Sequence, residues 1–365
     1  MAQITLKSLA HSYAPHPTGP EDYAIREMDH VWQQGGAYAL LGPSGCGKST
    51  LLNIISGLLT PSDGQVMFDE QVVNELPPEA RNIAQVFQFP VVYDTMTVYD
   101  NLAFPLRNVG KPEAKVRERV NEVAAILDLT SLLKRKARNL TADEKQKVSM
   151  GRGLVRDDVS AILFDEPLTV IDPQLKWKLR RKLKEIHERF NITMIYVTHD
   201  QLEASTFADK IAVMYDGQVV QFGTPRELFE TPAHTFVGYF IGSPGMNFAE
   251  IARTDSGART GTVDLTLPPA MLDIIRQTRS RNLKLGIRPE FVEVTNVPGD
   301  DTYEVEVGMT QDLGTYRIVS FTFAGETFRA RLGEDQPPPG RIAHVRFPEA
   351  WLNLYIDECR VEVGQ

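Results

Sequence analysis

The sequence predicts an α/β domain at residues 1–242 followed by an all-β domain at residues 243–365. In the first part, short apolar runs alternate with helical patterns, which is typical of a parallel sheet with crossover helices. In the second part, short runs of alternating polarity are separated by turn signals, which is typical of a small barrel. The length of 365 residues also exceeds what a single hydrophobic core usually supports.

The expected elements of the first domain follow from run length and periodicity. Short continuous apolar runs predict buried strands, whereas longer periodic segments predict helices. Strands are expected at residues 38–41, 161–164 and 194–197, and helices at residues 48–55, 111–127 and 173–190. Gly57 is the expected end of the first helix. Because the last helix lies between two of the strands, these three segments are expected to form a βαβ unit.

The second domain is expected to begin where the composition changes, near Gly242-Ser243-Pro244-Gly245. Alternating runs then predict strands at residues 283–287, 303–307, 316–323 and 342–347. The segment Pro337-Pro338-Pro339-Gly340 is a turn signal before the last of these strands. These patterns favour a small β-barrel domain.

Charge and cysteine content restrict the class of protein. The net charge of −9 and the pI near 5.4 argue against broad contact with nucleic acid or anionic lipid, so no nucleic-acid partner is expected. The two cysteines, Cys46 and Cys359, provide no disulfide framework, and the first residues show no signal-peptide pattern, which indicates an intracellular chain. No apolar stretch approaches 18 residues, so a role at a membrane would require docking onto other chains.

A glycine-rich loop follows the first predicted strand. Residues 42–49 fit the pattern Gly-x4-Gly-Lys-Ser, and a chance match in a chain of this length is about a one-in-a-hundred event. Glycines let backbone amides converge on phosphates, and the next helix presents its partly positive N-terminus to the same anion. Lys48 would reach the β- and γ-phosphates, and Ser49 would supply a hydroxyl to Mg²⁺. The predicted ATP-binding residues of this loop are Gly42, Pro43, Ser44, Gly45, Cys46, Gly47, Lys48, Ser49 and Thr50.

Two further strand ends carry candidate catalytic groups. Asp165 and Glu166 follow the buried run at residues 161–164, where Asp165 suits a Mg²⁺ ligand and Glu166 suits a group that orients or deprotonates water. His199 follows the run at residues 194–197. A single histidine after a strand is usually structural, but the C-terminal edge of a parallel sheet is where ligands bind in open α/β folds. We therefore expect His199 to contact the γ-phosphate.

These motifs, together with several others in the same order, resemble the ATPase subunits of ABC importers of the maltose, polyol and glycerol-phosphate type. The additional matching segments are residues 81–88, 96–104, 163–168, 198–204, 216–217, 221–225 and 286–290. The resemblance covers the whole chain. It implies a phosphate-loop ABC ATPase domain with a helical subdomain at about residues 88–158, and a C-terminal regulatory barrel similar to oligonucleotide-binding folds.

The resemblance also implies roles that the residues alone do not give. Gln88 would reach Mg²⁺ and the attacking water, and would couple the site to membrane subunits. Tyr13 resembles the aromatic residue that stacks on adenine, with Tyr23 as a competing candidate. Asp172 matches an aspartate that crosses the interface of an ATPase dimer.

The implied partners are two integral membrane permease subunits, a second ATPase subunit and, indirectly, a periplasmic or extracellular solute-binding protein. The implied location is peripheral, on the cytoplasmic side of the inner membrane. The resemblance points to sugars, glycerol or other polyols, or glycerol phosphates as the transported solute, and the sequence itself contains nothing that selects among them.

One segment departs from the family pattern. The family signature Leu-Ser-Gly-Gly-Gln covers the γ-phosphate of ATP on the partner subunit, and here the aligned residues 140–144 read Leu-Thr-Ala-Asp-Glu. Two glycines are lost, and Asp143 and Glu144 add negative charges that would repel a γ-phosphate by about 4 kcal/mol per charge pair at ~4 Å and an effective dielectric of ~20. Thr141 keeps a hydroxyl and can cap the helix that follows.

This departure leads to a hypothesis about assembly. The chain keeps its own ATP-binding half but presents an altered signature, so a heterodimer with a different ATPase is favoured over a homodimer. The competing interpretation is that the loop tolerates the change and a homodimer functions. The alternative function is a mainly regulatory or structural subunit that binds ATP but hardly hydrolyses it, and the presence of Glu166, Gln88 and His199 speaks against it.

Overall fold

A computed structural model describes residues 2–156, 158–255, 257–299 and 301–363 of the chain. The chain divides into two compact units, Met1–Pro225 and Arg226–Gln365. The composition change predicts the division later, between residues 242 and 243. The difference concerns the short helices α7 (Pro225–Glu230) and α8 (Thr235–Phe240), which follow the last strand of the first unit.

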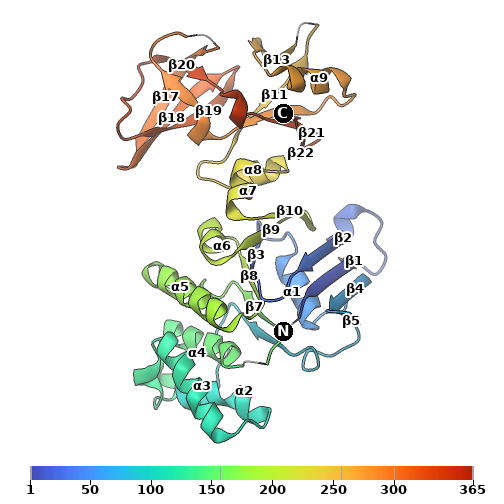
Figure 1. The fold of residues 1–365 in the computed structure, drawn as a ribbon, viewed down its shortest axis with the longest axis vertical. Helices are drawn as coiled ribbons and strands as arrows, with labels where there is room; N and C mark the ends of the chain where they lie inside the picture. The colour runs from blue at the N-terminus through green and yellow to red at the C-terminus, as the bar shows by residue number, and fades with distance from the viewer. Residues whose placement is uncertain (1, 157, 256, 300, 364–365) are drawn as a thin grey trace. The chain divides into compact units, whose positions relative to one another are not determined.

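The first unit contains two sheets (Figure 1). The larger sheet is parallel except for its edge strand β10, and its members in spatial order are β10 (Gln218–Gly223), β9 (Lys210–Tyr215), β3 (Ala37–Leu41), β8 (Met194–Thr198), β7 (Ala161–Asp165) and β6 (Ile83–Val86). The smaller sheet is antiparallel, in the order β2 (Tyr23–Trp32), β1 (Ile4–Ser12), β4 (Asp63–Phe68) and β5 (Gln71–Val72). The three strands expected from apolar runs are confirmed as β3, β7 and β8.

Helix α1 (Lys48–Ser56) shares one hydrophobic core with both sheets. Leu51, Leu52, Ile54 and Ile55 of this helix are fully buried in that core, together with apolar residues from β1, β3, β7 and β8. The helix ends at Gly57, which has a left-handed conformation with φ 84° and is the end that the sequence predicts. The loop before α1 is therefore fixed at both ends, by a buried strand and by a buried helix.

The remaining helices of the first unit occupy two regions. Helices α2 (Val98–Asn108), α3 (Glu113–Ile126) and α4 (Ala142–Leu154) pack on one another, within the expected helical subdomain. Helix α5 (Pro173–Phe190) connects β7 to β8 as expected, and α6 (Gln201–Phe207) follows β8. Asp172 caps the start of α5 by accepting a hydrogen bond from the backbone amide of Gln174, at 2.8 Å.

The second unit is built mainly from strands, as the alternating pattern predicts. One sheet contains β11 (Asn247–Glu250), β15 (Leu283–Ile287), β21 (Asn353–Ile356) and β22 (Cys359–Arg360), and a small sheet contains β12 (Ala252–Arg253), β13 (Ala258–Thr260) and β14 (Val263–Leu265). The largest contains β16 (Glu293–Thr295), β20 (Ile342–Arg346), β17 (Tyr303–Asp312), β18 (Tyr316–Phe323) and β19 (Glu326–Gly333). Helix α9 (Pro269–Gln277) was not predicted, and it buries Met271 and Ile275 from one face.

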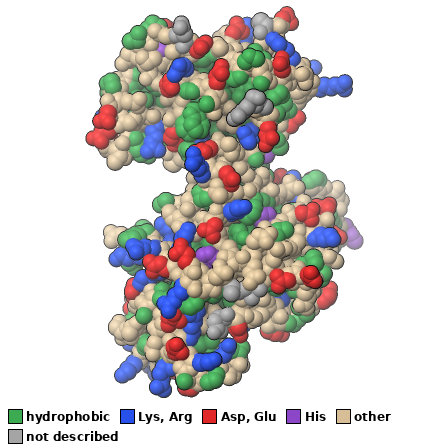
Figure 2. Space-filling model, in the orientation of Figure 1, with side chains coloured by type: hydrophobic (Ala, Val, Ile, Leu, Met, Phe, Trp, Pro, Cys, Tyr) green, Lys and Arg blue, Asp and Glu red, His purple; other side chains and the backbone are tan. Residues whose placement is uncertain are grey.

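Charged side chains of both signs are interspersed on the visible face of each unit (Figure 2). The described residues on that face therefore form no broad patch of a single charge sign.

The guanidinium of Arg288 explains why α7 and α8 belong to the second unit. It is 1% exposed and donates hydrogen bonds to the backbone carbonyls of Leu228, Phe229, Gly238 and Ile241. These carbonyls lie in and just after the two helices, where helices leave acceptors unpaired and favour positive charge. Burial lowers the pKa of Arg288 to about 10, so the side chain stays charged at neutral pH.

Replacing this arginine should destabilise the second unit selectively. Arg288→Met leaves buried carbonyls without donors, so the free energy of unfolding should fall by about 3 kcal/mol. The matched control is Arg346→Met, because Arg346 makes a half-exposed ion pair with Glu293 and should cost less than about 1 kcal/mol. Hydrogen exchange of second-unit peptides in the full chain measures both values, and equal losses would contradict the anchoring role of Arg288.

Candidate nucleotide-binding and hydrolysis site

The glycine-rich loop joins β3 to α1 at the C-terminal edge of the parallel sheet. Lys48 is buried, and its Nζ donates to the carbonyl oxygens of Gly42 and Pro43 at 2.9 and 2.8 Å. The ammonium group is thus held against the loop itself, next to the backbone amides that would receive a phosphate. Burial raises the pKa of the Cys46 thiol, which keeps the thiol protonated.

Two glycines of the loop adopt a left-handed backbone. Gly47 has φ 98°, and a Cβ there would overlap the carbonyl oxygen of Ala24 on β2. Gly45 has φ 82°, but no atom lies within 4 Å of the place that a Cβ would occupy. Gly47 therefore serves both backbone conformation and close packing, whereas Gly45 serves conformation alone.

The hydroxyl of Ser49 meets the carboxylate of Asp165 at the sheet edge. Ser49 Oγ donates to Asp165 Oδ1 at 3.2 Å, although the two residues are 116 positions apart. Burial raises the pKa of Asp165, and the neighbouring charge of Glu166 acts in the same direction. A hydroxyl and a partly desolvated carboxylate placed together are oxygen ligands of the type that Mg²⁺ prefers.

The next carboxylate lies beside the predicted histidine. His199 Nδ1 is 3.3 Å from Glu166 Oε1, and the hydroxyl of Thr169 is 3.4 Å from Glu166 Oε2. Glu166 has φ 45°, a left-handed conformation that costs energy for a residue with a Cβ. Such strain is typical of functional positions. The left-handed conformation also ends the extended backbone of β7 at Asp165.

Gln88 lies two residues beyond β6, which runs parallel to β7 with Val86 opposite Phe164. Since parallel strands end at one edge of the sheet, Gln88 lies at the same edge as Asp165 and Glu166. Its side chain is half-buried.

Tyr13 directly follows β1 and contacts Thr50, the last residue of the predicted phosphate loop. Its hydroxyl is 3.1 Å from the hydroxyl of Thr50, and its ring packs edge-to-face on His11 with centroids 4.7 Å apart. The side chain is 66% exposed, which leaves ring surface available for stacking. The competing candidate, Tyr23, instead lines a separate surface hollow with Ser8 and Arg26.

The altered signature forms a regular helix start. Thr141 caps α4 as predicted: its hydroxyl accepts from the amide of Glu144 at 3.2 Å, and the Glu144 carboxylate accepts from the amide of Thr141 at 2.9 Å. Asp143 pairs with Lys147 at 3.3 Å, and Arg135 lies 3.8 Å from Glu144. Both negative charges therefore have cations nearby, which weakens the electrostatic repulsion that the sequence suggests.

Sequence reasoning missed two contacts in this region, those of Thr169 and Gln146. Gln146 is fully buried in α4 and bonds to two loops of the site. The sequence did contain a signal for Gln146. Met150 follows it by four residues and Leu154 by eight, so the three side chains share one helix face, and the apolar pair predicts that this face is buried.

The chain resembles known proteins over nearly its whole length. The family model described as "ABC transporter" matches residues 25–169, and the model described as "MalK OB fold domain" matches residues 242–292. The sn-glycerol-3-phosphate import ATP-binding protein UgpC of Chromobacterium violaceum is 38% identical over 364 residues, covering 99% of this chain and 96% of the relative.

The chain belongs to the ABC transporter family.

Two further comparisons agree with membership of the ABC transporter family. The trehalose/maltose import ATP-binding protein MalK of Thermococcus litoralis is 42% identical over 320 residues, covering 84% of this chain and 86% of the relative. The solved structure of cbiO1 from Clostridium perfringens, part of the ABC transporter complex cbiONQ, matches with a TM-score of 0.56 at 26% identity, covering 62% of this chain and 90% of that chain. The resemblance predicted from the motifs is confirmed.

Membership makes this chain a transport-coupled ABC ATPase that binds ATP. Among the helices that the structure describes, none is both long and apolar enough to cross a bilayer.

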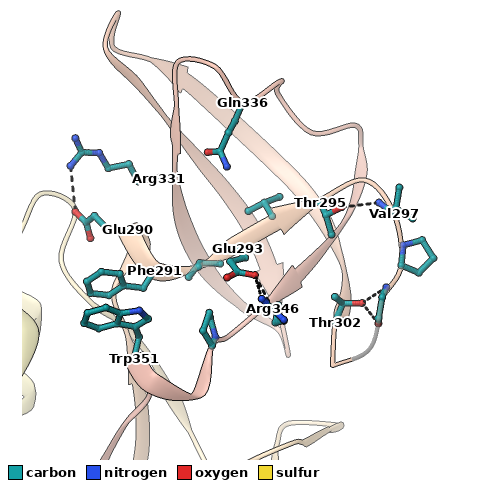
Figure 3. A pocket seen from close by; sticks show the side chains of 15 residues that line it. Glu290, Phe291, Glu293, Thr295, Val297, Thr302, Arg331, Gln336, Arg346 and Trp351 are labelled. Atoms are coloured by element: carbon teal, nitrogen blue, oxygen red, sulfur yellow. Dashed lines mark hydrogen bonds and ion pairs between the residues drawn. The ribbon is translucent and has the colours of Figure 1, made fainter.

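The second unit of this ABC protein contains a hollow of about 890 Å³ (Figure 3). The rings of Phe291 and Trp351 stack at one side of it, with centroids 3.8 Å apart. Arg331 lies 3.8 Å from Glu290, and Arg346 lies 2.6 Å from Glu293. Since these charged groups pair with one another, the hollow shows no strong preference for an ion of either sign.

The two loop glycines give a matched test of the phosphate-loop geometry. Gly47→Ala adds both backbone strain and a clash with the Ala24 carbonyl, so it should lower the free energy of unfolding by about 3 kcal/mol. Gly45→Ala adds strain alone and should cost about 1 kcal/mol. Urea denaturation of the two variants measures the difference, and a larger loss at Gly45 would contradict this description of the loop.

Proposed function

We propose that this chain is the ATP-binding and ATP-hydrolysing subunit that energises an ABC importer for a small polar solute. The observation that carries the proposal is the meeting of three strand ends: Ser49 bonds to Asp165, and the adjacent Glu166 lies 3.3 Å from His199. Residues at or beyond the ends of β3, β7 and β8 are thus assembled at one edge, where a triphosphate, a metal ion and a water molecule can meet.

Each group has a defined part in the proposed reaction. The loop amides of residues 42–50 and Lys48 bind the phosphates, and Tyr13 stacks on adenine. Ser49, Asp165 and Gln88 would hold Mg²⁺, which neutralises charge on the β- and γ-phosphates. Glu166 orients or deprotonates the attacking water, and His199 contacts the γ-phosphate while its imidazole holds the Glu166 carboxylate in place.

The segment after β6 supports docking of the permease subunits. Four side chains at alternate positions in this segment are large, apolar and exposed, namely Phe87, Phe89, Val91 and Tyr93, with Phe89 69% exposed. A run of exposed aromatic and aliphatic side chains is typical of a protein interface. Because Gln88 lies inside this run, docking there would couple the permease to the hydrolysis site.

The names of similar proteins support a proposal about the transported solute. The names of two similar proteins refer to import of sn-glycerol 3-phosphate and of trehalose or maltose. We therefore propose a sugar, glycerol or another polyol, or a glycerol phosphate as the solute. A solute-binding protein outside the membrane delivers it to two permease subunits, and this chain works on the cytoplasmic side of the inner membrane.

The signature region supports pairing with a second, different ATPase. The loss of both signature glycines at Ala142 and Asp143 hinders close backbone approach to a partner's γ-phosphate. The cations beside Asp143 and Glu144 reduce the repulsion without removing it. A heterodimer would combine this chain's phosphate loop with an unaltered signature from its partner.

Removing the water-handling carboxylate should stop hydrolysis without stopping binding. In the assembled transporter, Glu166→Gln should lower ATP turnover by about 100-fold or more, while affinity for a fluorescent ATP analogue stays within about twofold. The control is Glu188→Gln on the exposed side of α5, which should retain full turnover. Unchanged phosphate release by Glu166→Gln would overturn the proposed mechanism, and a rate that is already negligible in the unaltered complex would favour the regulatory alternative.

Restoring the family signature should activate the chain as a homodimer. A variant that combines Ala142→Gly, Asp143→Gly and Glu144→Gln should raise its ATP turnover about tenfold, equivalent to about 1.4 kcal/mol. Glutamine can still complete the helix cap with Thr141, so α4 should stay folded. Adding a candidate partner ATPase should raise turnover of the unaltered chain in the same way. Full turnover by the unaltered chain alone would refute the heterodimer.

A further inference from the structure

Helix α4 carries a buried glutamine that bonds to two loops of the site. Gln146 has no exposed surface, and its Nε2 donates to the carbonyl of Phe87 at 3.1 Å and to the carbonyl of Pro167 at 2.8 Å. Phe87 directly precedes Gln88, and Pro167 directly follows Glu166. One side-chain amide therefore joins the backbones that carry two of the proposed catalytic residues.

Among the described residues, three other side chains of α4 bond to the first of these loops, those of Lys145, Ser149 and Arg152. Ser149 Oγ accepts from the amide of Val91 at 3.2 Å, and Arg152 donates to the carbonyl of Val91 at 2.6 Å. Lys145 pairs with Asp94 at 2.8 Å. These contacts hold segment 87–94 along α4, whereas the bond from Gln146 to Pro167 also reaches the turn after β7.

The remaining oxygen of Gln146 indicates that stability alone does not explain the residue. Gln146 Oε1 is buried and has no hydrogen-bond partner among the described residues. A buried acceptor without a donor is unfavourable, and an apolar side chain of similar length would avoid that cost. What such a side chain could not provide is the pair of donated bonds.

We propose that Gln146 is a positioning residue for ATP hydrolysis. This proposal rests on the function proposed above. It holds the backbone beside Gln88 in a fixed relation to the backbone beside Glu166. It also lies on the helix whose first turn, at Thr141, carries the signature. Movement of α4, whether started by a partner nucleotide at its N-terminus or by a permease at segment 87–94, thereby changes the placement of both water-handling groups.

The test is Gln146→Met in the full-length subunit within the assembled transporter. Methionine has a similar length but cannot donate, so both carbonyls lose their shared amide. We expect kcat for ATP hydrolysis to fall at least about tenfold, because small displacements of catalytic groups are costly, while the Kd for a fluorescent ATP analogue changes by less than about twofold. Unchanged kcat, or equal losses in kcat and affinity, would overturn the proposal.

A matched control and a double-mutant cycle separate positioning from folding. Ser149→Ala removes a bond from the same helix to segment 87–94 but none to Pro167, so it should keep kcat within about twofold. In a Glu166→Gln background, Gln146→Met should cause a smaller further loss in the residual rate than in the unaltered chain, because part of its effect acts through the placement of Glu166. A loss of the same factor in both backgrounds would show general damage and overturn the proposal.

Lys48→Ala distinguishes failure of this inference from failure of the proposed function. If Lys48→Ala abolishes turnover but Gln146→Met does not lower it, only the role of Gln146 is wrong. If neither variant lowers turnover, the site itself is wrong and the role of Gln146 falls with it.

Discussion

The parallel pairing of β3, β8 and β7 is the constraint on which the candidate site depends. In this register Leu41 lies opposite Thr198, and Asp165 lies opposite Val197. The chain leaves each strand at the same edge, so the phosphate loop, the two carboxylates and His199 meet although they are far apart in sequence. A shift of one residue in any strand would turn these groups to the other face. Close packing of the core opposes such a shift, because residues of β3, β7 and β8 interlock with one another in a single hydrophobic cluster.

Helix α4 connects this edge of the sheet to segment 87–94, which carries exposed apolar side chains. The N-terminus of α4 carries the altered signature. Side chains of α4 form hydrogen bonds with segment 87–94, and Gln146 forms one with Pro167 in the turn after Glu166. Packed and hydrogen-bonded elements transmit displacement because they cannot deform continuously. The geometry therefore links the surface where a membrane subunit would dock with the groups that would handle water.

The negative charges of the altered signature are partly offset by neighbouring cations. Asp143 and Glu144 are two carboxylates in the first turn of a helix, where the helix dipole favours them. Lys147 and Arg135 lie close enough to offset part of their charge, and Glu144 also completes the helix cap. What remains different from the family pattern is mainly the loss of glycine, which limits how closely the backbone can approach a phosphate.

Local sequence was enough to predict β3, β7 and β8, the end of α1 at Gly57 and the whole extent of α5, because period, run length and glycine position act over short distances. Tertiary structure decided what depends on distant partners. The 3.2 Å bond from Ser49 to Asp165, the assignment of α7 and α8 to the second unit through Arg288, and the two bonds of Gln146 each join segments that no local pattern relates. The physical reason is that a buried donor must find its acceptor wherever the fold brings one, and that position is a property of the packed chain.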